Sequence, residues 1–174
     1  MYIYSGGVAN STTVNSSGWM YIFSGGTHRG SLQMSTGATV SAYTGAVIDF
    51  TVSEMNSADD YLINDLALIK GAPTYTIIVS ANQNNGIYKL AQGAENFNQT
   101  ITVGDGTVNY GTVSANGTAL EYNGTTYQLM LDSGNLTLKI EGNKSEFCAY
   151  NLLSKTATVK RTCFSVNIQP AGAA

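Results

Sequence analysis

The heptapeptide "MYIYSGG" at residues 1–7 recurs as "MYIFSGG" at residues 20–26. The match continues beyond it, because residues 1–18 and residues 20–37 are identical at eight of eighteen positions. A shorter, degenerate copy, "TVSAYTGAVIDF", occupies residues 39–50. Similar segments at a fixed spacing are typical of chains in which each copy packs on the next, since every copy then needs the same contact surface.

Each repeat reads as a short strand with alternating residues, a Gly-Gly corner, a second short polar strand and a further glycine. A unit this short cannot bury its apolar face alone. Strands stacked about 4.8 Å apart in parallel would bury a continuous column of side chains. The sequence therefore predicts an all-β fold that begins with a short parallel β-solenoid of about 19-residue coils.

Period-2 alternation assigns Ile3, Ile22 and Val40 to the inner column of this stack. The opposite face then carries an aromatic ladder, formed by Tyr2, Tyr4, Tyr21 and Phe23. We interpret the ladder first as a device that stabilises the stack. A ligand-facing platform on which sugars stack is the alternative.

From residue 49 onward, two-residue turn signals recur, for example "NNG" at 84–86 and "NG" at 123–124. Flanking alternation predicts hairpins and an antiparallel β module. The expected strands lie near 75–80, 86–91, 99–103, 107–113, 118–122, 125–131 and 135–140. The stretch "DDYLINDLALIKGAP" at 59–73 is read as strand, with a helix as the alternative. One continuous β-solenoid is the alternative to the two-part architecture.

Composition divides the chain into residues 1–48 (repeats), 49–141 (β-rich module) and 142–174 (an atypical basic tail with both cysteines). Residues 1–141 have a net charge of −6 and residues 142–174 a net charge of +3. Charged residues make up 11% of the chain, against about 25% in ordinary soluble domains, which favours an extracellular β-rich protein. No basic stripe suited to nucleic acid and no apolar run long enough for a membrane span occur in the sequence.

The stretch "SGGVANSTTVNSSGWMYIFSGGTHRG" resembles the repeats of AIDA-type autotransporter adhesins, which are bacterial surface proteins. The later stretch from "NDLALIKGAP" to "VNYGT" is similar to a module that follows such repeats. The resemblance implies a right-handed β-solenoid, export to the cell surface as an autotransporter passenger, and a role in adhesion, self-association or biofilm formation. Because Met1 aligns with Met20, the chain is expected to begin within an array.

The resemblance also implies that hydroxyl groups of the repeats carry protein-linked sugars in some members. The matching positions here are Ser5, Ser11, Thr12, Thr13, Ser16, Ser17, Ser24, Ser35 and Thr36.

The sequence contains no recognisable catalytic, phosphate-binding or zinc-binding motif, so we predict no enzyme activity, no cofactor and no metal site. The only histidine, His28, is expected in a solvent-facing turn, because Ala9 takes its place in the first repeat. Asp59, Asp60 and Asp65 form the only acidic cluster. A solvated loop is the leading interpretation of this cluster, with calcium binding or sugar cleavage as alternatives.

Cys148 and Cys163 are fifteen residues apart in the tail. In an oxidising compartment they would form a disulfide worth about 3 kcal/mol in the chain-entropy model. In a reducing compartment they would be two unrelated thiols.

These observations predict a non-enzymatic extracellular segment that acts in adhesion or self-association. Its expected partners are host or bacterial surface glycans or proteins, or copies of itself. The alternative is a carbohydrate-binding module of a polysaccharide-degrading enzyme, which would use the aromatic ladder. A lyase or hydrolase fragment that uses the acidic cluster is a further rival.

Overall fold

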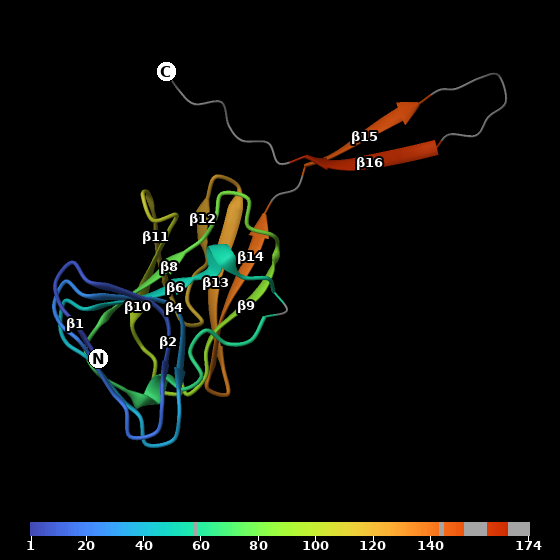
Figure 1. Cartoon of the computed structure of the whole chain (residues 1–174). Coiled ribbons are helices and arrows are strands. Elements are labelled where there is room, and N and C mark those ends of the chain that lie inside the picture. Colours follow the sequence, from blue (N-terminus) through green and yellow to red (C-terminus); the bar gives the residue numbers. More distant parts are fainter. Residues whose placement is uncertain (58, 143–144, 152–159, 167–174) are drawn as a thin grey trace.

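A computed structural model describes residues 1–57, 59–142, 145–151 and 160–166 of the chain, the last two ranges for the backbone course (Figure 1). The predicted all-β class is confirmed: these residues form strands and two single 3₁₀ turns, η1 (Val52–Glu54) and η2 (Leu66–Leu68). No helix in the described part is long and apolar enough to cross a membrane.

The first strand of each repeat joins one parallel sheet. Its order is β1 (Tyr2–Ile3), β3 (Trp19–Ile22), β5 (Thr39–Ala42) and β7 (Ile69–Gly71). Tyr2 lies opposite Tyr21, and Trp19 lies opposite Thr39. The spacing is therefore 19 residues between the first two repeats and 20 between the second and third.

The second strands form a longer sheet that continues past the repeats. β2 (Val8–Val14), β4 (Thr27–Met34), β6 (Val47–Thr51), β8 (Thr74–Ile78) and β10 (Thr100–Gly104) pair in parallel, and β11 (Asn109–Ser114) closes the sheet as an antiparallel strand. The boundary drawn after residue 48 falls inside β6. The antiparallel prediction is wrong for β8, which pairs in parallel with β6 and β10, whereas β10 and β11 do form an antiparallel pair. Turn signals show where the chain reverses but not which distant strand becomes a neighbour.

A third side of the stack begins where β2 and β4 bend, at Ser11 (φ 40°) and Gly30 (φ 71°). Beyond the bend, Leu32 pairs with Ile63, and Ile63 pairs with Ala91, both in parallel. The stretch at 59–73 thus contains one bridge residue, the turn η2 and the short strand β7 rather than a helix.

Hairpins supply the antiparallel part of the fold. This sheet has the order β12 (Leu120–Tyr122), β13 (Thr125–Asp132), β14 (Asn135–Gly142) and β9 (Gly86–Ala91). Its turns lie at the predicted Asn123-Gly124 and Ser133-Gly134 pairs, where all four residues have positive φ. Such a pair of left-handed residues is what a two-residue hairpin turn requires.

One hydrophobic core joins the parallel stack to the antiparallel sheet, and it runs from Ile3 to Ile140. Ile3 lies opposite Ile22, as predicted for the inner column. Val40 is also buried, but it lies opposite Met20, and Ala42 is the residue that faces Ile22. The 20-residue offset between the second and third repeats sets Val40 opposite the buried Met20, whereas an offset of 19 residues would have set it opposite Tyr21 on the outer face.

Stacked glycines form the corner between the two strands of each repeat. Gly6, Gly25 and Gly45 have φ of 77°, 76° and 84°. The Gly6 N–H donates to the Gly25 carbonyl at 2.9 Å, and the Gly25 N–H donates to the Gly45 carbonyl at 2.8 Å. The corners are therefore held in register along the stack.

Replacing the middle corner glycine should destabilise the protein more than replacing the outer one. Alanine at Gly25 or Gly6 suffers the same left-handed strain, about 1–2 kcal/mol. Only at Gly25 would the added Cβ also meet a neighbour, at 2.6 Å from Ser5 Oγ and 3.1 Å from Ser5 Cβ. We expect Gly25→Ala to lower the free energy of unfolding by about 1 kcal/mol more than Gly6→Ala. Equal losses in denaturant titrations would contradict the stacked corner.

Candidate functional site

The aromatic side chains predicted for the outer face of the first sheet form a stacked ridge. Ring centroids are 5.4 Å apart for Tyr2 and Tyr21, and 5.0 Å apart for Tyr4 and Phe23. Two further residues, missed by the sequence analysis, extend it. Tyr43 stacks on Phe23 at 5.2 Å, and Trp19 meets Tyr21 edge-on at 6.4 Å. Alignment of the third repeat with the second places Tyr43 below Phe23 and could have revealed it. We call these six residues the aromatic ridge.

Ring orientation limits what the aromatic ridge can bind. The three closest stacked pairs between neighbouring repeats have interplanar angles of 10° to 13°, so each of these rings covers a face of the next. Such stacking stabilises the repeats. Tyr2 and Tyr4 have stacking partners only in their own repeat and in the second one among the described residues, and they are 61% and 62% exposed. Open ring faces are therefore available at one end of the ridge.

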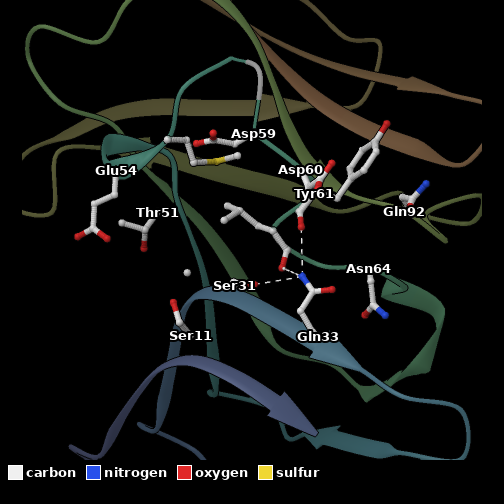
Figure 2. A pocket seen from close by; sticks show the side chains of 13 residues that line it. Ser11, Ser31, Gln33, Thr51, Glu54, Asp59, Asp60, Tyr61, Asn64 and Gln92 are labelled. Carbon is white, nitrogen blue, oxygen red and sulfur yellow. Dashed lines mark hydrogen bonds between the residues drawn. The ribbon is translucent and has the colours of Figure 1, made fainter. Parts of the chain in front are cut away.

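The three carboxylates of the acidic cluster do not come together. Asp59 and Asp60 line a cleft (Figure 2). Asp65 instead caps η2, where its Oδ1 accepts a hydrogen bond from the Ala67 N–H at 3.0 Å. In the described part of the chain, no three His, Cys, Asp or Glu side chains are grouped closely enough to hold a metal ion.

The cleft of Figure 2 has a volume of about 560 Å³ and lies where the chain leaves the repeat pattern after β6. Its floor comes from the bend and the third side of the stack, and one wall comes from described residues within 51–57 and 59–62. Gln33 is fixed in the floor: its Nε2 donates to Ser31 Oγ at 3.1 Å and to the carbonyls of Tyr61 and Leu62 at 3.2 Å. The lining residues are Ser11, Gly30, Ser31, Gln33, Thr51, Glu54, Met55, Asp59, Asp60, Tyr61, Leu62, Asn64 and Gln92.

A second cleft, of about 630 Å³, adjoins the first and shares four lining residues with it, Ser11, Gly30, Thr51 and Glu54. We call the two clefts together the polar groove. Five carboxylates line it, from Asp49, Glu54, Asp59, Asp60 and Asp105. The second cleft also contributes the guanidinium of Arg29. Sequence reasoning found only Asp59 and Asp60, because stacking of distant strands brings the others to the same place.

Asp49 is the buried member of this set. Its side chain is 3% exposed, and its Oδ2 lies 3.2 Å from Arg29 Nε. Its other oxygen, Oδ1, has no hydrogen-bond partner among the described residues, nor does the buried Thr51 Oγ1. Burial raises the pKa of Asp49, while the Thr76 hydroxyl and Arg29 act in the opposite direction. The backbone N–H groups of Val108 and Thr107 lower the pKa of exposed Asp105.

His28 is not in a solvent-facing turn, contrary to the sequence prediction. It is fully buried in β4, opposite Ala9 on one side and Ile48 on the other. Neither ring nitrogen has a hydrogen-bond partner among the described residues. The glycine pair before His28 marks a corner, but the alternation of the strand turns this side chain inward. Burial lowers the pKa of His28 to about 4, so the ring is neutral at physiological pH.

Cys148 and Cys163 occupy the antiparallel pair of β15 (Ser145–Asn151) and β16 (Lys160–Val166), where the backbone register places them directly opposite each other. The residues that would link this pair of strands fall outside the described ones. The disulfide stays a prediction.

Comparison of the chain with models of known protein families, with curated proteins and with solved structures finds no match in any of the three.

The buried histidine should make stability depend on pH. In the unfolded chain His28 has its ordinary pKa near 6.5, whereas in the folded protein its pKa is about 4. Between these two pH values the unfolded chain binds a proton at His28 and the folded protein does not. Stability is therefore lost as pH falls through that window. Between pH 7 and pH 5 the loss from this group is about 2 kcal/mol. His28→Leu should remove that component, measured as the difference between the two proteins in unfolding free energy at each pH. An unchanged pH dependence would show that His28 is not buried as described.

Proposed function

We propose that this chain is a non-enzymatic, extracellular segment of a bacterial surface protein that acts in adhesion or self-association. In this proposal the repeats form coils of a right-handed β-solenoid, similar to the AIDA-type passengers that the sequence resembles. The partner is another repeat of the same kind, presented by a second copy of the chain.

The observation that carries the proposal is the stacking surface that β1 and β2 present to another repeat of the same kind. β1 and β2 are the outermost strands of their sheets. The same repeat holds four exposed large apolar side chains, Met1, Tyr2, Tyr4 and Val8, which are 51% to 62% exposed. Residues 1–18 contain no charged side chain. Edge strands of monomeric proteins are usually protected by charges, proline or a bulge that turns the edge away.

The backbone of β2 offers groups for strand pairing. The Gly7 carbonyl accepts the Thr27 N–H at 3.0 Å, so alternation turns the N–H and C=O groups of Ala9 toward β4. Those of Val8 and Asn10 then point away from the sheet. A repeat from a second copy would pair these groups through its second strand and cover the open ring faces of Tyr2 and Tyr4 through its first, which supports self-association through these edges.

Carbohydrate binding by the aromatic ridge is the second candidate, and the exposed rings of Tyr2 and Tyr4, with centroids 6.2 Å apart, are the observation that favours it. The stacked inner rings favour it less, because their faces are covered. A sugar that stacks on this end of the ridge would compete with self-association, so the two candidates can be separated in one experiment.

A charge placed on the open edge should abolish self-association. We expect the unmodified chain to associate as its concentration rises in sedimentation-velocity experiments. Val8→Lys should keep it monomeric, because a lysine on an edge strand opposes pairing with another copy. Val8→Thr is the matched control, since Thr27 holds the same position in the second repeat.

The control should associate like the unmodified chain. A chain that stays monomeric at every concentration would overturn the proposal. Monomers that bind neutral oligosaccharides, and lose that binding on Tyr4→Ala, would favour the carbohydrate-binding alternative instead.

A further inference from the structure

We propose that the polar groove binds a ligand that carries several primary ammonium groups, and that an oligomer of an amino sugar is the form that fits it best. This site is separate from the sheet edges and goes beyond adhesion or self-association. It rests on the charge, the unpaired acceptors and the lining of the groove.

Charge gives the first argument. Half of the ten acidic residues in residues 1–141 line the groove, together with one of the four basic residues. A cleft lined by charges of one sign concentrates ligands of the opposite sign. The second nearby cation, Lys89, lies with its Nζ 5.8 Å from the centre of the Tyr61 ring. The net charge of the residues around the groove is therefore negative, which favours a cationic ligand.

The unpaired acceptors give the second argument. Asp49 Oδ1 and Thr51 Oγ1 have no donor among the described residues, although both side chains line the groove. The two residues lie two positions apart on β6, so their side chains leave the same face of the strand. An ammonium group has three donors and no acceptor. It can satisfy such oxygens and also offset the charge of a buried carboxylate, which a neutral hydroxyl group cannot.

The spacing of the carboxylates distinguishes this ligand from a metal ion. A calcium ion needs six to eight oxygen ligands around one point, and no three acidic side chains of the described residues meet in that way. The carboxylates are instead divided between two adjoining clefts that share Thr51 and Glu54. An extended ligand with a positive charge on each unit matches this arrangement.

The rest of the lining favours a sugar over a simple polyamine. The first cleft adds amide side chains from Gln33, Asn64 and Gln92 and the aromatic ring of Tyr61 (Figure 2). The Gln33 amide is held through its nitrogen by three acceptors, which fixes the direction of its oxygen. Fixed amides and an aromatic ring suit the hydroxyl groups and the apolar face of a sugar ring. An alkyl polyamine has neither the hydroxyl groups nor the ring that would make these contacts.

The test compares glucosamine hexamer with N-acetylglucosamine hexamer by isothermal titration calorimetry at low ionic strength and mildly acidic pH. The two sugars differ in whether each unit carries an ammonium group. We expect binding of the glucosamine hexamer only, weakened by added salt. Spermine is the third probe, and it should bind more weakly than the glucosamine hexamer.

Variants locate the binding. Glu54 lines both clefts, so Glu54→Gln should lower the affinity for the glucosamine hexamer roughly threefold to fivefold. Glu121→Gln removes the same charge from exposed strand β12, outside the groove, and should leave the affinity unchanged. Circular dichroism should show the same fold for both variants.

Three results would overturn the proposal: no binding of the glucosamine hexamer, equal binding of the two hexamers, or equal effects of the two variants. Spermine that binds as tightly as the glucosamine hexamer, with the same response to Glu54→Gln, would keep the ammonium site and overturn its assignment to an amino sugar.

Discussion

The register between successive repeats is the constraint on which the rest of this structure depends. Parallel pairing at an offset of 19 and then 20 residues sets Ile3 against Ile22 inside the stack and Tyr2 against Tyr21 outside it. A shift by one residue would turn every side chain of these strands to the opposite face. The stacked glycine corners oppose such a shift, because each must lie over the next to complete its hydrogen bond.

The same register explains where the fold departs from simple repetition. After β6 the chain leaves the stack at η1 and returns to it at Ile63, which pairs with Leu32 and Ala91. The side chain of Asn64 then makes the hydrogen bonds that a neighbouring strand would make to Met34. Its amide oxygen accepts from the Met34 N–H at 2.9 Å, and its amide nitrogen donates to the Met34 carbonyl at 2.8 Å. This departure creates the wall of the polar groove (Figure 2). β11 ends the second sheet as an antiparallel strand (Figure 1). One edge strand of this sheet, β11, is therefore antiparallel to its neighbour, and the other, β2, is parallel to its neighbour.

Local features of the sequence predicted local features of the structure well. The turns at Asn123-Gly124 and Ser133-Gly134 were predictable, because turn chemistry depends on the residues of the turn itself. Strand positions followed from alternation for the same reason. The parallel pairing of β8 with β6 and β10 was not predictable in this way, since pairing between distant strands is decided by the whole stack. The burial of His28 did not follow from its alignment with Ala9, because only the alternation of β4 shows that this position points inward. Only Asp59 and Asp60 of the polar groove could be grouped from the sequence, because Asp49, Glu54 and Asp105 reach the groove from separate elements.

The most direct test of the account is a measurement of scalar couplings across hydrogen bonds by solution NMR. The structure predicts couplings from the Phe23 amide nitrogen to the Ile3 carbonyl carbon and from the Tyr43 amide nitrogen to the Ile22 carbonyl carbon, because both N···O distances are 2.9 Å. These two couplings place successive repeats against each other at the 19- and 20-residue offsets. Couplings that instead pair Phe23 or Tyr43 with residues of their own repeat would contradict the stacked arrangement.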